Sequence, residues 1–292
     1  MVLLYIPPVQ NLLRREVTAY ASKATGMQIQ VERIDLRFPL NLLVRGVEVI
    51  QQPDTLLSLE SLNVRVQAWP LLKGKVEVDE VTLSQVAVNS ANLIEGMQIK
   101  GVLGRFFLQS HGVDLSNETA VVNRTELSDT HIQLLMTDTT TTPKDTTASA
   151  PVNWKVNLHQ LKLKNVSFGM KLPADSMKMA AYIGEATIDD AKADLKNQFY
   201  GLKQFLLSGA SASYDTGEAQ PSEGFDASHM AVRNIRIGLD SLLYEGRNMN
   251  AVIREITMEE RSGLSITSLT GRLFSNDSII RIPELKLQTP HS

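Results

Sequence analysis

Hydrophobic and polar residues alternate along most of the chain. After the first 26 residues, apolar side chains recur at every second position, beginning with Ile29 and Val31. A period of two is typical of strands that bury one face. The phase slips between Val31 and Ile34, and again between Leu59 and Leu62. These slips predict bulges or tight corners rather than long flat ribbons.

The alternating runs follow one another with short turns. Neighbouring strands are therefore expected to pair antiparallel, with almost no room for crossover helices. A short helix near residues 191–205 also fits the weaker pattern there, although Gly201 argues against a long one. Residues 81–88, 161–168 and 279–287 each join two alternating runs across polar residues, which favours a repetitive, elongated sheet over a sandwich of two sheets without excluding the sandwich.

The first 25 residues follow a different pattern. Residues 1–6 form an apolar run far shorter than the ~20 residues that span a bilayer, so they are either one end of a longer hydrophobic helix or an apolar terminus that packs on the body. From Pro8 onward, apolar residues recur at spacings of three and four, which predicts an amphipathic helix over about residues 8–25, ending at Gly26. This helix either caps the end of a sheet or lies at a membrane interface. Its apolar positions include Val9, Leu12, Leu13, Val17 and Tyr20.

A polar, Thr-rich stretch interrupts the alternation at residues 137–151, which predicts an exposed linker or long loop. The chain is accordingly divided into a membrane-proximal segment with the helix (1–25), a first β segment (26–136), the linker (137–151) and a second β segment (152–292). A second loop is expected at residues 217–228.

Composition narrows the classes of function. The net charge is -3 and the longest basic cluster is Arg14-Arg15, so nucleic acid is not an expected partner. Cysteine is absent, which removes disulfides, thiolate catalysis and Cys-type zinc sites.

The chain carries no recognisable catalytic motif. No two of its five histidines lie at metal-ligand spacing, and the nucleophile-elbow, metalloprotease and phosphate-loop patterns are missing. Acidic pairs such as Asp189-Asp190 and Glu259-Glu260 are interpreted as solvated charge, because neighbours in a strand point to opposite faces. We therefore expect a protein that is not an enzyme and has no cofactor and no metal.

The aliphatic side chains themselves form the remaining candidate site. An apolar sheet face must be covered by a helix, a second sheet or an apolar ligand. If the sheet curves into a half-pipe, these side chains line a groove suited to acyl chains; in a sandwich, the same residues are ordinary core. The groove candidates are Leu62, Val64, Val66, Val76, Val78, Val81, Leu83, Val86 and Val88, with the parity that faces the groove left open.

Three segments of the chain resemble segments of a known group of proteins. The run from residue 6 to 13 before the helix, and the following strand from Ile29 to Phe38, look like the start of TamB-family proteins just after their inner-membrane helix. Residues 59–83, with the Leu-Leu-Lys-Gly turn at 71–74, resemble the repeated phrase of the AsmA-like group, and residues 263–287 are similar to later TamB repeats.

This resemblance implies an elongated antiparallel sheet that forms a taco-shaped groove, related to bridge-like lipid transfer proteins. It implies a periplasmic location in a Gram-negative-type bacterium, anchored to the inner membrane. The implied function is to conduct phospholipids between the two membranes, to support outer-membrane protein assembly, or both. The implied partners are phospholipid acyl chains, the inner membrane and an outer-membrane barrel of the TamA type. The alternative from the residues alone is a structural or adhesive pair of β-sandwich domains.

Overall fold

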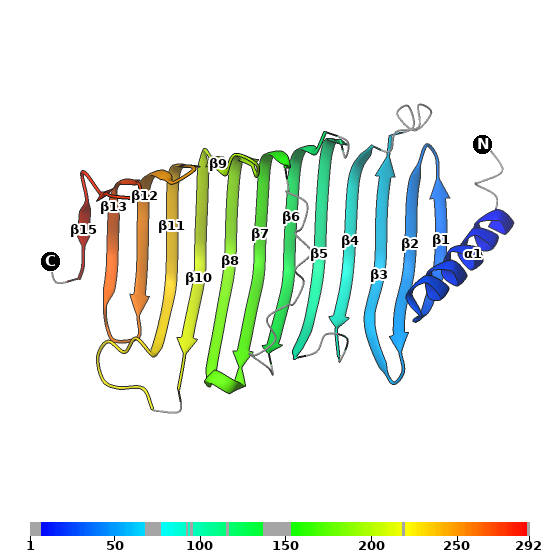
Figure 1. The fold of residues 1–292 in the computed structure, drawn as a ribbon, viewed down its shortest axis with the longest axis horizontal. Coiled ribbons are helices and arrows are strands. Elements are labelled where there is room, and N and C mark those ends of the chain that lie inside the picture. The colour runs from blue at the N-terminus through cyan, green and yellow to red at the C-terminus, as the bar shows by residue number, and fades with distance from the viewer. Residues whose placement is uncertain are drawn as a thin grey trace.

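A computed structural model of the chain shows one large β-sheet with a helix at one edge (Figure 1). The structure describes residues 7–67, 77–91, 93, 96–114, 117–136, 153–217 and 220–290. The fold is mainly β, as the alternating pattern predicts, and the described strands belong to a single 15-stranded sheet. The two-sheet sandwich is therefore not the architecture of the described residues.

The first half of the chain forms the helix α1 and six strands. Their bounds are α1 (Pro7–Thr25), β1 (Gln28–Arg37), β2 (Asn41–Gln51), β3 (Asp54–Val66), β4 (Val78–Asn89), β5 (Met97–Asp114) and β6 (Thr119–Met136). The second half forms a short 3-10 turn and nine strands. Their bounds are β7 (Lys155–Leu172), η2 (Pro173–Asp175), β8 (Met177–Asp194), β9 (Phe199–Leu202), β10 (Gln204–Asp215), β11 (His229–Glu245), β12 (Asn248–Glu260), β13 (Ser265–Ser275), β14 (Ile280–Arg281) and β15 (Lys286–Gln288).

The strands lie in chain order and pair antiparallel, with one exception. β6 and β7 are parallel, so Thr119 lies opposite Lys155 and Leu135 opposite Lys171. The expectation of an uninterrupted antiparallel meander is wrong at this place. The sheet itself continues across it, because β7 then pairs with β8 along its full length. The segment 137–151, named above as a linker, lies outside the described residues.

The short helix considered near residues 191–205 is also wrong. These residues form the end of β8, all of β9 and the start of β10. β9 is paired on both sides, since Tyr200 lies opposite Ala193 of β8 and Tyr244 of β11. Two ladders of backbone hydrogen bonds therefore override a weak local preference for helix.

The helix α1 covers the free edge of β1, and its bounds agree with the predicted helix (Figure 1). The Oγ atom of Ser22 accepts a hydrogen bond from the backbone N–H of Ile29 at 3.0 Å, and the guanidinium of Arg14 donates to the carbonyl oxygen of Glu32 at 2.5 Å. Both backbone groups belong to β1. Side chains of α1 thus occupy hydrogen-bonding groups that an edge strand would otherwise present to other chains.

The opposite edge of the sheet is built from two very short strands. β14 pairs with Phe274 and Ser275 of β13, and β15 pairs with residues 268–270. Large apolar side chains remain exposed here, among them Ile280 at 72% and Leu287 at 51%. Arg281, Pro283 and Lys286 lie among them, and such charges and prolines are common on exposed sheet edges.

The sheet is a single layer. Among the described residues, the strands with substantial contacts are those paired in the ladder, and no two strands pack face to face. No large side chain of the described residues is fully buried. Each face of the sheet is therefore covered only by its own side chains within the described part of the chain.

Candidate functional site

One transverse line crosses the sheet where the strand pairing skips a residue. Between β1 and β2, Val31 pairs with Val47 and Arg33 with Arg45, but Glu32 and Gly46 are passed over. The same gap recurs in each of the next six strand pairs, up to β7 and β8. We call this line the unpaired row. It consists of Glu32, Gly46, Glu60, Gln85, Gly104, Asp129, Asn165 and Gly184.

Left-handed backbone conformations occur along the unpaired row. Gly46, Gln85, Asp129 and Asn165 have φ angles of 59°, 49°, 52° and 53°. Glycine and asparagine adopt this region at little cost, whereas other residues are disfavoured there. Each such residue turns the backbone so that two consecutive side chains point to the same face, as in a β-bulge.

The glycines of the row allow the strands to approach closely. A Cβ atom on Gly104 would lie 2.7 Å from Cβ of Asp129 and 2.8 Å from its carbonyl oxygen. A Cβ atom on Gly46 would lie 2.7 Å from Cβ of Glu32. A side chain at either position would force neighbouring atoms apart, so space favours glycine at both positions, and the left-handed conformation favours it at Gly46 as well.

The unpaired row keeps one face of the sheet apolar on both of its sides. On one side of the row the directly adjacent residue of each strand is apolar, and on the other side the second residue is apolar. The two apolar residues are therefore three positions apart, which reproduces the phase slips in the sequence. We call the first set the line before the row and the second set the line after it. The apolar line before the row comprises Val31, Val47, Leu59, Val86, Leu103, Val166 and Ile183, and Thr130 is its polar exception. The apolar line after the row comprises Ile34, Val44, Leu62, Leu83, Phe106, Leu127, Leu163, Ala186 and Leu207.

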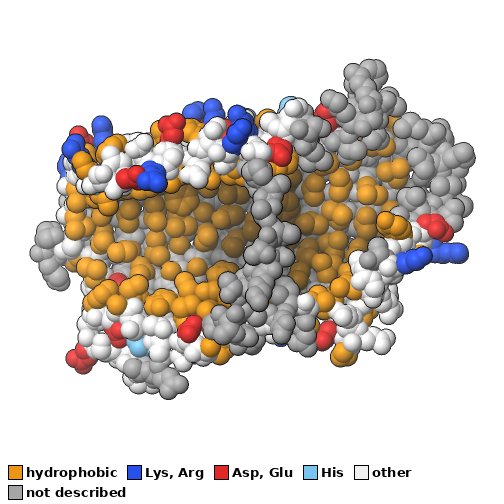
Figure 2. Space-filling view, viewed as in Figure 1, with side chains coloured by type: hydrophobic (Ala, Val, Ile, Leu, Met, Phe, Trp, Pro, Cys, Tyr) orange, Lys and Arg blue, Asp and Glu red, His pale blue; other side chains and the backbone are white. Residues whose placement is uncertain are grey.

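The opposite face is polar next to the row. Residues paired directly across the ladder share a face. Between the unpaired row and the apolar line that contains Leu83, each strand contributes one residue, and all of these residues are polar. They form one polar line, which comprises Arg33, Arg45, Ser61, Ser84, Arg105, Ser128, Lys164, Glu185 and Ser208. The sheet therefore has an apolar face and an outer face that is polar next to the row. Figure 2 shows hydrophobic side chains gathered over the apolar face, with charged side chains at the ends of the strands.

The groove candidates from the sequence share one face wherever the structure describes them. Leu62 pairs with Leu83, Val64 with Val81, and Val66 with Val78. Val86 and Val88 lie beyond the unpaired row and pair with Leu59 and Leu57. Val76 lies outside the described residues. The structure thus brings eight of the nine candidates together on the apolar face, while their contact with a ligand stays a prediction.

Side chains of the apolar face are open to solvent near one end of the strands. Val88 and Ile132 lie opposite Gly101, and Phe168 lies opposite Ile132. These three side chains are 37%, 39% and 40% exposed. Apolar surface of this kind in adjacent strands is typical of a surface that binds an apolar partner.

The helix candidates are placed only in part. Val9, Leu12, Leu13 and Val17 lie within α1, but their side chains fall outside the described residues. Tyr20 is 77% exposed. The helix is therefore observed, and its amphipathic character stays a prediction.

A second, shorter unpaired row crosses β6, β7 and β8 at Asn123, His159 and Asp190. The Asp190 carboxylate accepts a hydrogen bond from Lys203 Nζ at 2.7 Å and contacts His159 Nδ1 at 3.1 Å. The hydrogen bond from Lys203, followed by that from His159, lowers the pKa of Asp190. Side chains of this cluster are 40–78% exposed. Exposed ion pairs of this kind contribute little to stability and do not isolate a catalytic group from water.

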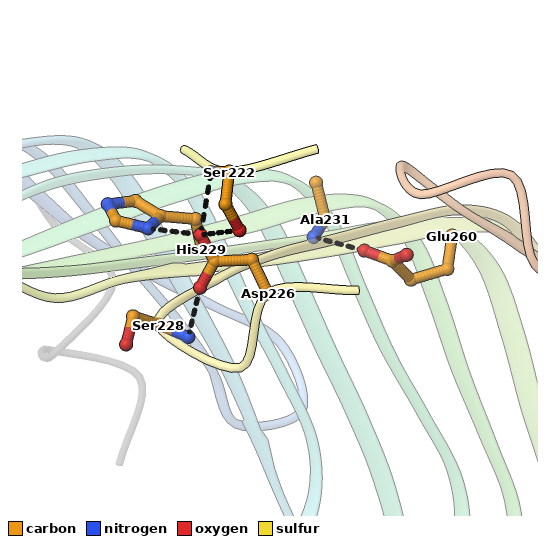
Figure 3. Close-up of polar contacts among 6 residues, drawn as sticks. All are labelled: Ser222, Asp226, Ser228, His229, Ala231 and Glu260. Atoms are coloured by element: carbon orange, nitrogen blue, oxygen red, sulfur yellow. Dashed lines mark hydrogen bonds and ion pairs between the residues drawn. The ribbon is translucent and has the colours of Figure 1, made fainter. Parts of the chain in front are cut away.

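Polar groups gather where the loop between β10 and β11 returns to the sheet, and His229 and Glu260 among them are buried (Figure 3). Asp226 accepts hydrogen bonds from the backbone N–H groups of Ser222 and Ser228 at 3.0 and 2.9 Å, and its carboxylate lies 3.0 Å from Nδ1 of His229. These hydrogen bonds hold the pKa of Asp226 well below its usual range. The Ser222 hydroxyl also donates to Asp226, at 3.2 Å, rather than to the histidine.

This arrangement fixes the loop and does not form a catalytic triad. A serine nucleophile needs its hydroxyl within reach of a base, and Ser222 is instead bonded to the carboxylate. Glu260 plays a similar part at the next turn, where its carboxylate accepts the backbone N–H of Ser262 at 2.7 Å and that of Ala231 at 3.5 Å. Hydrogen bonds from Ser262 and then from Ala231 and Arg261 lower the pKa of Glu260.

A shallow cavity of about 300 Å³ lies on the outer face between β8, β10, β11 and β12. Its lining includes Glu185, Thr187, Arg236, Arg254 and Glu255, so charges of both signs are mixed in it. The described residues contain no cluster of side chains able to hold a metal ion. None of the described helices is long and apolar enough to cross a membrane.

The apolar face is consequently the strongest candidate site, and comparisons with known proteins add nothing to it. A scan against protein-family models finds no match, and a search of curated proteins finds no match either.

Proposed function

We propose that the apolar face forms a groove that binds and conducts the acyl chains of phospholipids. The protein acts without enzymatic chemistry in this proposal: hydrocarbon chains lie against the aliphatic side chains, and polar head groups stay in water. The envelope location, the inner-membrane anchor and the outer-membrane barrel partner implied by the resemblance to the TamB family belong to the same proposal.

One observation carries the proposal. One apolar line runs over nine neighbouring strands and a second runs beside it over eight of them, with Thr130 as its polar exception, while the line between them on the outer face is polar throughout. Eight strand spacings of about 4.8 Å make this apolar surface about 38 Å wide. Such a continuous surface is larger than the single exposed apolar residues of ordinary protein surfaces.

Hydrocarbon chains suit this surface better than other ligands. Each CH₂ group removed from water contributes about 0.8 kcal/mol, so an acyl chain binds to aliphatic side chains without a polar anchor. The surface is built mainly from Val, Leu and Ile, with Phe106 and Phe168 among its few aromatic side chains in the described residues. The shaded floor between charged borders in Figure 2 further supports a groove with space for chains inside and head groups at the borders.

The test compares two neighbours on β4. Leu83 lies on the apolar face opposite Leu62 and Phe106, whereas Thr82 lies on the outer face opposite Asn63 and Phe107. We expect Leu83→Asp to reduce the phospholipid that co-purifies with the chain several-fold, while Thr82→Asp leaves it unchanged. Both variants are expected to keep the β-type circular dichroism spectrum, because an open face lets a carboxylate reach water.

Two results would contradict the proposal. Equal phospholipid content in both variants, with intact folds, would mean that the apolar face does not hold lipid. Unfolding of Leu83→Asp alone would mean that this face is covered by protein, because an unpaired charge inside a core is costly.

A further inference from the structure

The unpaired row interrupts the backbone pairing along one continuous line. Seven successive strand pairs, from β1 with β2 to β7 with β8, are paired on both sides of the row and not at it. Within β1 to β8, rotation of one side of the sheet against the other about this line therefore need not break a ladder pair. We call the two sides the wings of the sheet.

Polar contacts at the row run mainly along it. The amide of Asn165 donates to the carboxylate of Asp129 at 2.8 Å, and both residues belong to the row. The hydroxyl of Thr130 donates to the carbonyl oxygen of Ser128 at 3.1 Å, which links two residues of one strand across the row. The contact between Asn165 and Asp129 ties neighbouring strands together along the row, and the Thr130 hydrogen bond is a contact within β6 that would have to adjust when the wings rotate.

Packing does not fix the angle between the wings. Within the described residues, no second layer lies on either face of the sheet, and substantial contacts are confined to paired strands and to α1 with β1. Residues of the row in left-handed conformation, such as Gln85 and Asn165, already depart from the extended geometry that keeps a strand straight.

A driving force for movement comes from the apolar side chains. Both wings present apolar residues to the same face, for example Leu59 in one wing and Leu62 in the other. Closing the wings removes this surface from water, which is favourable when the face is empty. An apolar occupant covers the same side chains, so closing the wings would no longer remove additional apolar surface from water.

From these observations we infer that the unpaired row is a hinge: the wings close over an empty apolar face and open when hydrocarbon occupies it. The phospholipid part of this inference rests on the proposed function, whereas the hinge itself needs only an apolar occupant.

The test measures distances between spin labels in the full chain, which has no native cysteine. A cross-row pair is made by Lys100→Cys with Gln109→Cys, two exposed residues of β5 on opposite sides of the row at Gly104. A control pair is made by Arg45→Cys with Lys164→Cys, two exposed residues of one polar line in one wing. The control pair runs parallel to the row and does not respond to bending about it.

Both pairs are measured in lipid-extracted protein, with palmitoyl-oleoyl phosphatidylglycerol vesicles, and with dodecyl maltoside. With the wings at about a right angle, an opening of about 20° between arms of about 13 and 17 Å lengthens the cross-row distance by about 3 Å. We expect this lengthening with both probes, and no change in the control pair.

The outcomes separate the hinge from the proposed function. Lengthening with detergent but not with phospholipid, together with no extracted phospholipid, supports the hinge and contradicts the proposed function. Bound phospholipid with an unchanged cross-row distance in every condition overturns the hinge and leaves the proposed function standing. Equal changes in both pairs also overturn the hinge, because they indicate a rearrangement that is not centred on the row.

Discussion

The two faces of this sheet are made by the same strands and differ sharply in character. Along β4, Leu83 lies on the apolar face and the adjacent Ser84 on the outer face. A simple alternation would exchange the faces wherever a strand bends through an extra residue. Here the unpaired row adds that extra residue at the same line from β1 to β8, in left-handed conformation in β2, β4, β6 and β7, so the apolar face stays apolar from one wing to the other.

This contrast shows that the turn of the strands at the row and the spacing of hydrophobic residues in the sequence depend on each other. Left-handed residues of the row turn the backbone of β2, β4, β6 and β7, and the hydrophobic spacing of three at the row matches this turn. Neither feature alone keeps a continuous apolar face on a single-layered sheet.

The largest loss of stability is expected at Gly104, a residue of the unpaired row that keeps the two faces distinct. Gly104→Val places a branched side chain against Asp129, whose backbone oxygen would lie 2.8 Å from the new Cβ. We expect a loss of about 3 kcal/mol in the free energy of unfolding, from overpacking against backbone that cannot move aside. Urea denaturation followed by circular dichroism measures it.

The matched control for this substitution is Gly169→Ala on β7. A Cβ at Gly169 would meet its nearest neighbours at 3.9 and 4.0 Å, which is ordinary contact. Its unfolding free energy should change by no more than about 0.5 kcal/mol. Equal losses in the two variants would mean that the unpaired row is not a tightly constrained line.

Two exposed aliphatic residues sharpen the comparison of the faces directly. Val102 and Ile132 are 47% and 39% exposed and lie on adjacent strands. Val102 pairs with His131 and lies on the outer face, whereas Ile132 pairs with Gly101 and Phe168 on the apolar face. We expect Ile132→Asp to lower the co-purified phospholipid by at least half and Val102→Asp to leave it unchanged, as measured by lipid extraction. An equal loss of co-purified phospholipid in both variants would mean that the two faces do not differ in lipid binding.

A smaller effect is expected at the end of the strands, where Asp226 fixes the loop between β10 and β11. The pKa of Asp226 is lowered in the folded chain, so its carboxylate stabilises the fold at pH values above its unfolded pKa of about 3.9. This stabilisation is lost as the pH falls below that value toward the folded pKa. Asp226→Asn should therefore melt at a lower temperature than the parent at pH 7, and the difference should shrink below about pH 4. A difference in melting temperature that is the same at pH 7 and pH 3 would contradict this role.

The smallest loss of stability is expected at the edge strand β1, where it contacts α1. Ser22→Ala removes the acceptor for the backbone N–H of Ile29, a contact of 3.0 Å between α1 and β1. We expect a loss of about 1 kcal/mol in the free energy of unfolding. Ala19→Ser, at an exposed position of the same helix, is the control and should change it by less than about 0.5 kcal/mol. Equal values for Ser22→Ala and the parent would mean that the helix does not contribute this edge contact in solution.

The sequence predicts much of this fold through its periodicity. The strands, the helix and the places where the phase slips are confirmed: the slips at Val31–Ile34 and Leu59–Leu62 coincide with Glu32 and Glu60 of the unpaired row. The eight described groove candidates lie on one face because a period of two, corrected for the slips, fixes the side on which each residue lies.

The remaining features depend on partners that are distant in sequence. That Gln85 lies beside Gly104 and Asp129 beside Asn165 follows from the register between strands, which no single segment encodes. The parallel pairing of β6 with β7 likewise reflects tertiary pairing rather than local pattern. The polar loop contacts of Asp226 were missed because serines and an aspartate in a loop usually signal only a turn.

The central claim is that the apolar face is open and holds lipid, and native mass spectrometry of the purified chain, with lipid extraction from the same sample, tests it most directly. We expect several phospholipids bound per chain, lost together when the lipid is extracted. A lipid-free, compact and stable monomer would contradict the claim, because its aliphatic side chains would then have to be covered by the protein itself.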